Sequence, residues 1–259
     1  MPRRCYLAKK DLQTFNWSKF KMGSIYILQA AQCLQSELWP NINWKRCNDK
    51  VTSLQNRIVK SVSKREWRKA KRLCYLLTQS FSARALAVKR VTENKGKKTA
   101  GIDGKVWSTP GQKIQAVERI AKWHGYQPKA LKRIRIPKKD KSKTRPLSIP
   151  TMEDRARQAL YMLALQPIAE TLADVNSYGF RKKRRCADAM EQIFKALQHK
   201  GAAQWILEAD IKGFFDNIDF QWLMENIPMN KQVLRAWLNC GFIEGGKWFP
   251  THEGVPHQK

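Results

Sequence analysis

One carboxylate stands out in this sequence for the chemistry that its setting allows. Asp210 lies near the end of the apolar run WILEADI at residues 205–211, and the sequence KGFF follows at once. A short apolar run of this kind is typical of a buried strand, so we expect a rigid sheet to present the Asp210 carboxylate. The residues that frame it are Gly213, Phe214 and Phe215. Mg²⁺ prefers oxygen ligands, and the pattern therefore indicates one side of a metal-dependent nucleotidyl-transfer site.

The charge of the chain predicts a polyanionic partner. The 259 residues include 50 Lys and Arg against 21 Asp and Glu, a formal net charge of +29, and the basic residues are spread along the whole chain. Each phosphate that a cation neutralises releases a condensed counterion, which favours RNA or DNA over other partners. A membrane is not expected, because no apolar stretch approaches the roughly 20 residues of a spanning helix.

The cysteines indicate a reducing compartment. The six cysteines are scattered, with no CxxC pair and no close Cys/His group, so neither zinc nor a disulfide framework is expected. The N-terminus is a poor signal peptide, because three glutamines interrupt residues 24–36. We therefore expect reduced thiols in a cytoplasmic protein.

Apolar periodicity predicts a helical N-terminal part. One helix has its apolar face at Val51, Leu54, Ile58 and Val62, and residues 67–81 and 83–91 repeat the same spacing. The outer faces of these helices are basic and carry Lys60, Lys64, Arg65, Arg68, Lys69, Lys71 and Arg72. A solvated face and an RNA-contacting layer are both consistent with this pattern.

A loop and a hairpin follow the helices. Residues 94–104 combine lysines with three glycines, which permit tight turns and close backbone approach. Alternating residues from 131 to 136 and apolar residues at 147 and 149 predict a β-hairpin with a turn near residues 140–143. Cations at its tip would reach over a polyphosphate, although an ordinary charged hairpin has the same pattern.

The remaining sequence predicts further helices around the Asp210 run. Residues 153–172 have a helical pattern with a kink expected at Pro167, and residues 177–181 form a turn. A helix over residues 187–197 is expected to bury Met190, Ile193, Phe194 and Leu197. Asp219 is expected to cap a helix that runs through Ile227. Residues 248–256 resemble the approach to another turn.

Four segments, in this order, resemble conserved blocks of the reverse transcriptases encoded within group II introns, which also act as RNA maturases. Residues 94–104 are similar to the N-terminal extension loop, and residues 133–150 with Asp154 and Arg155 to the first polymerase block. Residues 177–181 and 209–218 are similar to the second and third blocks. The resemblance covers residues 41–256.

The resemblance implies an α+β fold, with a helical N-terminal layer followed by the fingers and partial palm of a right-hand polymerase. Residues 1–39 stay an unassigned N-terminal segment. Residues 40–122 form the helical region with the basic glycine loop, and residues 123–259 form the truncated fingers and palm. The implied partners are an intron RNA template, a DNA primer and a dNTP. The implied compartment is the cytoplasm of a bacterium, or an organelle.

The resemblance also implies roles for single residues. Asp210 would bind two Mg²⁺ ions about 3.5–4 Å apart, with the backbone carbonyl of Ile211 facing one of them. Phe215 would lie under the sugar of the nucleotide, next to Gly213 and Phe214. Lys138 and Arg145 would reach the triphosphate from the hairpin, with Lys139 as an alternative to Lys138.

The sequence departs from the family pattern near its end. His257 stands where the family has a glutamine that supports the nascent base pair, and a Tyr-x-Asp-Asp turn with two further carboxylates does not appear. We therefore expect an N-terminal fragment, truncated before that turn and inactive alone, with an unpaired strand edge at residues 205–211. Whether the chain is itself an enzyme is left open. The alternative is a non-catalytic, intron-RNA-binding splicing cofactor.

Overall fold

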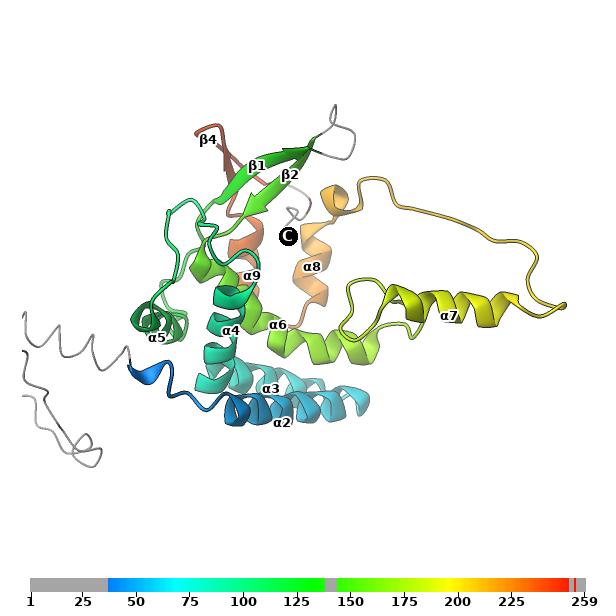
Figure 1. Ribbon diagram of the computed structural model, residues 1–259, viewed down its shortest axis with the longest axis horizontal. Coiled ribbons are helices and arrows are strands. Elements are labelled where there is room, and N and C mark those ends of the chain that lie inside the picture. Colours follow the sequence, from blue (N-terminus) through cyan, green and yellow to red (C-terminus); the bar gives the residue numbers. More distant parts are fainter. Residues whose placement is uncertain (1–36, 138–143, 252–253, 255–259) are drawn as a thin grey trace, which may run out of the picture.

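The computed structural model describes residues 37–137, 144–251 and 254. The fold is a mixed α+β one, as expected, and Figure 1 shows its helices below a small sheet. The first part of the chain contains α2 (Trp44–Ser63), α3 (Trp67–Gln79), α4 (Phe81–Glu93) and α5 (Pro110–Arg119). The middle contains β1 (Leu131–Pro137), β2 (Thr144–Ile149), α6 (Met152–Leu172) and α7 (Cys186–Leu197). The last part contains η3 (Phe214–Asn217), α8 (Phe220–Asn226), α9 (Lys231–Leu238), β3 (Phe242–Glu244) and β4 (Lys247–Phe249).

Local capping residues set where the helices begin. Asn43 accepts a hydrogen bond from the Arg46 amide at the start of α2, and Asp219 caps α8 as predicted. Thr109 and Gln112 form a capping box at α5, where Pro110 occupies the first turn. Each cap satisfies an amide that has no partner within its own helix.

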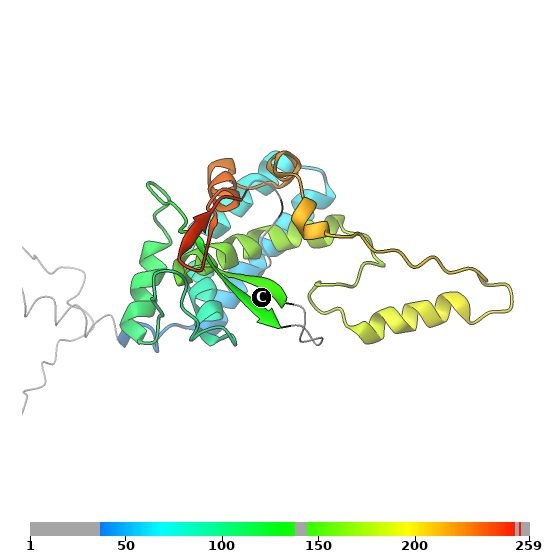
Figure 2. The ribbon, with the colours of Figure 1, turned by 90° about the horizontal axis from the view of Figure 1, so that it is seen from above.

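The predicted helices of the N-terminal part are confirmed, and their apolar faces form one core with α6. Ile58, Leu77, Val88 and Leu160 are fully buried in it. α6 packs against α2, α3 and α4, so residues before the glycine loop and residues after the hairpin share the same core. Figure 2 shows the long α6 crossing these helices.

The predicted hairpin is also confirmed, and it belongs to a sheet of four strands in the order β2-β1-β3-β4. β1 pairs antiparallel with β2 and parallel with β3, through Leu131 opposite Phe242. The sequence prediction missed β3 and β4. Their turn contains Gly245 and Gly246, both with positive φ, a Gly-Gly signal that is typical of tight hairpins.

The prediction of a strand over residues 205–211 is wrong. In the structure this segment has no strand partner and is extended in solvent, with Trp205 93% and Leu207 91% exposed. The helix before it forms as predicted, but the side chains expected to be buried are exposed: Met190, Ile193, Phe194 and Leu197. A strand needs a neighbour for its backbone groups, and the described residues place none beside this one.

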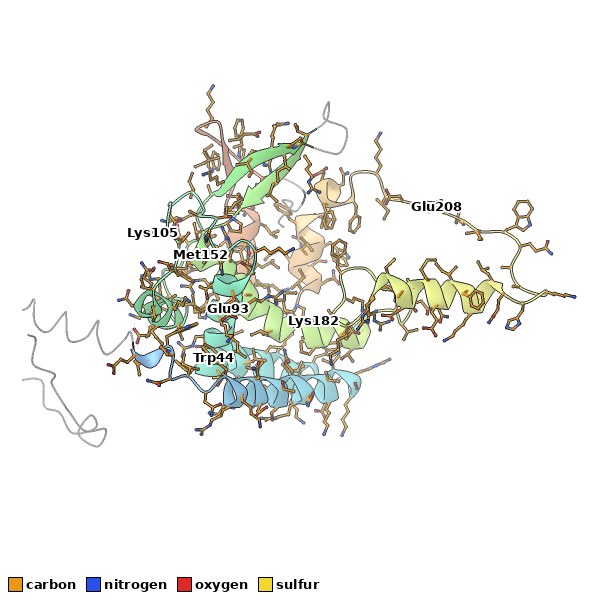
Figure 3. All side chains as sticks on the ribbon, in the orientation of Figure 1. Trp44, Glu93, Lys105, Met152, Lys182 and Glu208 are labelled. Carbon is orange, nitrogen blue, oxygen red and sulfur yellow. The ribbon has the colours of Figure 1, made fainter. Side chains whose placement is uncertain are left out.

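We call residues 186–213, which comprise α7 and this extended segment, the arm. Both views show the arm projecting from the rest of the molecule, and Figure 3 labels Glu208 on its extended part. The arm therefore adds nothing to the helical core. It leads to Asp210 without a rigid sheet beneath it.

Leu77 and its neighbour Leu76 test the core directly. Leu77 is fully buried and Leu76 is 47% exposed on the same helix. Leu77→Ala is expected to lower the free energy of unfolding by about 2–5 kcal/mol, because it opens a cavity in the shared core. Leu76→Ala is expected to cost less than about 1 kcal/mol. Chemical denaturation of the two variants checks this, and equal losses would contradict the assignment of the core.

Candidate nucleic-acid interface and polymerase site

Exposed cations are concentrated on α2, α3 and the turn between them, and we call this set the basic face. All seven cations predicted for it are exposed, and four more exposed cations join them on α2 and its N-terminal turn. The full set is Lys45, Arg46, Lys50, Arg57, Lys60, Lys64, Arg65, Arg68, Lys69, Lys71 and Arg72. Lys69 forms an ion pair with Glu66 at 2.9 Å. Positive charge of this density attracts a phosphate backbone.

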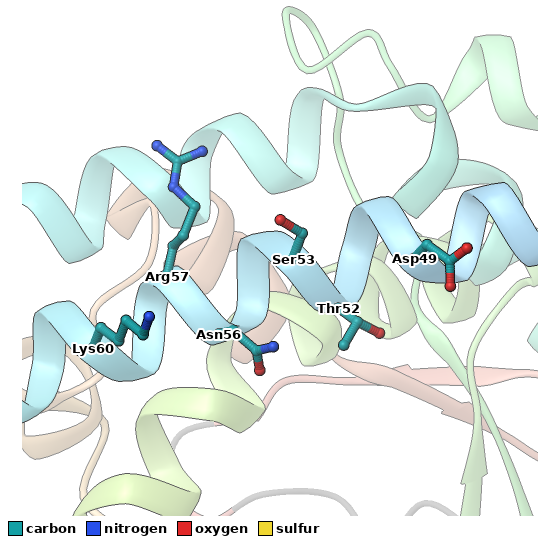
Figure 4. A pocket seen from close by; sticks show the side chains of 6 residues that line it. All are labelled: Asp49, Thr52, Ser53, Asn56, Arg57 and Lys60. Carbon is teal, nitrogen blue, oxygen red and sulfur yellow. The ribbon is translucent and has the colours of Figure 1, made fainter.

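One hollow lies along α2 within this surface, with a volume of about 460 Å³. Figure 4 shows the side chains that line it: Asp49, Thr52, Ser53, Asn56, Arg57 and Lys60. Apart from the Asp49 carboxylate, these are hydroxyl, amide and cationic groups, the kinds that contact phosphate and sugar without reading sequence. The hollow is therefore suited to a nucleic-acid backbone.

The glycine loop, residues 94–104, lies against the start of α6. Gly101 is buried there, and Gly104 has a positive φ of 65°. Close backbone approach is confirmed at Gly101, where a Cβ atom would lie 2.6 Å from the Thr151 Cα, and not at Gly104, where it would meet nothing within 4 Å. Lys95, Lys97 and Lys98 of the same loop are exposed.

The hairpin carries its arginines in two different settings. Arg145 is exposed near the tip end of β2, while Lys138 and Lys139 lie outside the described residues. Arg133 stacks on Phe242, with its guanidinium carbon 3.3 Å from the ring centroid. Burial lowers the pKa of Arg133, and the nearby carboxylates of Glu244 and Asp216 oppose that shift. Arg133 thus joins β1 to β3, whereas Arg145 is exposed to solvent.

A chain of hydrogen bonds fixes the base of the hairpin to α6 and α9. The Trp237 indole donates to the Tyr126 hydroxyl at 2.8 Å, and that hydroxyl donates to the Asp154 carboxylate at 2.5 Å. Thr151 also donates to Asp154, at 2.6 Å. Burial raises the pKa of Tyr126, with a further contribution from Asp154, so the hydroxyl keeps its proton. Burial likewise raises the pKa of Asp154, while its hydrogen bonds act in the opposite direction.

Arg157 joins α5 to the same region of α6. Its buried guanidinium forms an ion pair with Glu153 at 2.7 Å and donates to the carbonyls of Arg119 and Ile120. These carbonyls lie at the C-terminal end of α5, where helix carbonyls lack intrahelical partners. The guanidinium also stacks on Tyr126 at 4.0 Å. The buried charge of Arg157 is therefore stabilised by an ion pair, by backbone hydrogen bonds and by an aromatic ring.

Asp210 is exposed at the end of the arm, where it enters a turn. The segment from Ala209 to Asp216 lines an open hollow of about 560 Å³. Gly213 has φ 64°, a left-handed conformation that reverses the chain into η3. Phe214 and Phe215 meet edge to face at 5.4 Å, and both rings are partly exposed. The carboxylate, the Ile211 backbone and the two rings thus share one small surface, without the rigid sheet that was expected to present it.

Gly254 brings the end of the described chain to the same surface. Its amide donates to the Ile218 carbonyl, and a Cβ atom there would lie 2.6 Å from the Asp216 carbonyl oxygen. The sequence predicted only the approach to a turn over residues 248–256 and no contact with the Asp210 surface. The positive φ of 76° at Gly254 and the close backbone approach both require glycine.

The described residues do not by themselves fit a centre of two Mg²⁺ ions. Asp210 and Asp216 are the carboxylates that line this hollow. Within the part of the chain that the structure describes, no three His, Cys, Asp or Glu side chains form a group able to hold a metal ion. Mg²⁺ usually takes one or two carboxylates together with substrate phosphates and water, so two ions here would need ligands beyond those that the described residues gather.

Comparisons with known proteins agree with this arrangement. The family model for the N-terminal domain of reverse transcriptase matches residues 39–120, and that for reverse transcriptase (RNA-dependent DNA polymerase) matches residues 136–257. The chain therefore belongs to the reverse transcriptase family, in the branch of group II intron-encoded reverse transcriptases and maturases.

Three relatives show the extent of the similarity. The group II intron-encoded protein LtrA of Lactococcus lactis subsp. cremoris is 33% identical over 178 residues, which are 66% of this chain and 29% of that protein. Protein YkfC of Escherichia coli is 33% identical over 199 residues, 71% of this chain and 51% of that protein. Maturase-like protein 1 of Euglena gracilis is 25% identical over 229 residues, 86% of this chain and 49% of that protein. The chain thus spans about half or less of each relative.

Among the described helices, none is long and apolar enough to cross a membrane.

The sequence did not predict the roles of Tyr126, Trp237 and Arg157, which hold the hairpin, α9 and α5 against α6. No local signal could have identified them, because the hydrogen-bond partners lie 28 and 111 residues apart in the sequence.

Tyr126→Phe tests the hydrogen-bond chain at the base of the hairpin. The variant leaves Asp154 and Trp237 each without one partner in a partly buried site. The free energy of unfolding is expected to fall by about 1–3 kcal/mol. Tyr75→Phe on the exposed surface of α3 is the control, with an expected change within about 0.5 kcal/mol. Urea denaturation measures both, and a Tyr126→Phe variant as stable as its control would contradict the network.

Proposed function

We propose that this chain is the fingers and partial palm of an RNA-directed DNA polymerase of a group II intron. It binds intron RNA through the basic face and the glycine loop, and it does not polymerise DNA alone. The observation that carries the proposal is the basic face, where eleven exposed cations stand on α2, α3 and the turn between them, and both helices belong to one packed core. A rigid array of cations binds a phosphate backbone without first having to be ordered.

The proposed roles at the polymerase surface follow the family pattern. Reverse transcriptases use divalent metal ions, and Asp210 with the Ile211 carbonyl would supply the ligands from this part of the chain. Phe215, next to Gly213 and Phe214, would lie under the incoming sugar. Arg145 and Lys138 would contact the triphosphate of a dNTP whose primer and template are DNA and RNA. These contacts become productive only when further carboxylates complete the metal site.

The second candidate is a non-catalytic protein that binds intron RNA as a splicing cofactor. Two observations favour it. The basic face stands on a complete core, whereas Asp210 stands on the unpaired arm. RNA binding therefore depends on the rigid part of the molecule, and catalysis would depend on the part without fixed neighbours. The two candidates share the RNA-binding surface and differ only in whether Asp210 acts.

RNA affinity is expected to depend steeply on salt. A protein that contacts 6–10 phosphates loses about 10³–10⁵ in affinity between 50 and 200 mM salt. Replacing Lys60 and Arg68 by Gln is expected to weaken binding and to lower the salt slope by about one for each lost contact. The matched control replaces Lys195 and Lys200 on the arm, both exposed, and keeps the slope. Filter binding across a salt series measures this, and identical slopes for both pairs would reject the basic face.

The purified chain is expected to leave a DNA primer on an RNA template unextended with Mg²⁺ and dNTPs. The reason is the incomplete carboxylate set around Asp210. Asp210→Ala is expected to change RNA affinity by no more than about twofold, because one exposed charge is largely screened at physiological salt. A primer-extension gel and an RNA titration check the two statements. Robust extension by the wild-type chain that is lost in Asp210→Ala would refute the proposed inactivity.

A further inference from the structure

The side chain of Arg155 holds the glycine loop against α6. Its Nε donates to the Pro150 carbonyl at 2.9 Å, its Nη1 to the Gly96 carbonyl at 3.1 Å, and its Nη2 to the Thr99 carbonyl at 2.6 Å. All three nitrogens of the guanidinium thus donate hydrogen bonds to backbone carbonyl oxygens. Two of those oxygens belong to the glycine loop, and the third belongs to the residue that precedes the α6 N-cap.

The setting of Arg155 separates it from the cations of the basic face. Its side chain is partly buried, and burial lowers the pKa of Arg155 while the Asp103 carboxylate opposes the shift. A guanidinium committed to three carbonyls has few donors left for a phosphate. Arg155 therefore connects segments of the protein by hydrogen bonds.

Gly101 shows independently that the loop is pressed onto α6. A Cβ atom on Gly101 would lie 2.6 Å from the Thr151 Cα, 2.8 Å from the Thr151 amide nitrogen and 2.9 Å from the Pro150 carbonyl oxygen. These atoms are backbone and cannot move aside without displacing the loop or the helix. Two contacts, one at Gly101 and one at Arg155, thus hold the same loop at the same helix end.

The three lysines of the loop stand beside these fixed points. Lys97 lies between the two carbonyls that Arg155 binds, Lys98 is next to the second, and Lys95 precedes the first. Hydrogen bonds from the Lys97 amide to Asn94 and from the Thr99 amide to Gly96 complete the turn. All three lysine side chains are exposed. A loop fixed in this way presents its cations without a further loss of backbone conformational entropy on binding.

We propose that Arg155 is a positioning residue, which fixes the glycine loop so that Lys95, Lys97 and Lys98 meet the phosphates of bound RNA in a preformed arrangement. The RNA contact rests on the proposed function above, whereas the fixing of the loop rests on the hydrogen bonds alone. Arg155 acts through the three lysines and does not touch the RNA.

Hydrogen exchange of the free protein tests the fixing of the loop. Arg155→Ala is expected to speed exchange of the Lys97, Thr99 and Gly104 amides by about tenfold or more, the effect of losing a charge-assisted hydrogen bond. Gly101→Ala is expected to do the same without touching Arg155. Gly111→Ala is the matched control, since an added Cβ there meets nothing within 4 Å. Buried amides of α4 and α6 report whether each variant is folded. Unchanged loop exchange in both folded test variants would overturn the proposal.

RNA binding tests what the fixed loop does. Replacing Lys95, Lys97 and Lys98 by Gln is expected to weaken RNA binding strongly in the wild type and several-fold less in Arg155→Ala. The lysines and Arg155 act as one unit, so their effects are not additive. The same non-additivity is expected with Gly101→Ala and not with Gly111→Ala. Additive losses in both test backgrounds would overturn the positioning role.

Arg155→Lys separates positioning from direct contact. The variant keeps the positive charge, but one ammonium group cannot span three carbonyls as the planar guanidinium does. It is expected to resemble Arg155→Ala in loop exchange and in RNA affinity. Full RNA affinity in Arg155→Lys with a loosened loop would show a direct charge contact and overturn the proposal. If the wild type binds no RNA, the proposed function fails, and the exchange experiment still decides whether Arg155 fixes the loop.

Discussion

The first two turns of α6 hold several of the segments that surround the sheet. Asp154 accepts a hydrogen bond from Tyr126, which in turn accepts one from Trp237 of α9, while Arg155 holds the glycine loop and Arg157 holds the end of α5. Asp154, Arg155 and Arg157 each bond to a segment far away in sequence, and Thr151 supports Asp154 from the start of the helix. The rest of α6 is packed against α2, α3 and α4, so its first turns have a rigid base. A polar hub of this kind is stable only because its members satisfy one another.

The hub explains how a small sheet can be combined with a large helical part in one fold. The sheet buries few apolar side chains of its own, such as Leu131 and Ile149, and the main core lies among the helices. The hairpin is therefore held at its base by directional hydrogen bonds, while its far end extends past the core. Arg145 is therefore exposed on a hairpin whose base is fixed.

The local features of the fold could be predicted from the sequence, whereas features that depend on distant partners could not. Periodicity predicted the helices of the core, and the cap at Asp219 was predicted from one side chain. The Gly245–Gly246 turn carried an equally local signal that the sequence analysis overlooked. The run at residues 205–211 has the composition of a strand, but composition does not supply a neighbour, and the structure leaves it unpaired. The sequence thus indicated which residues lie near Asp210, but it did not predict that the segment leading to Asp210 has no strand beside it.

The open arm has a consequence for how long the chain survives in a cell. Proteases bind their substrates as extended strands, and they cut where the backbone is exposed and free of regular structure. Residues 203–211 already have this conformation, with bulky side chains such as Trp205 and Leu207 in solvent. Cleavage there would separate α2 and α3 from the residues that follow the arm. Covering this one stretch of backbone would therefore protect the molecule from proteolysis at this site.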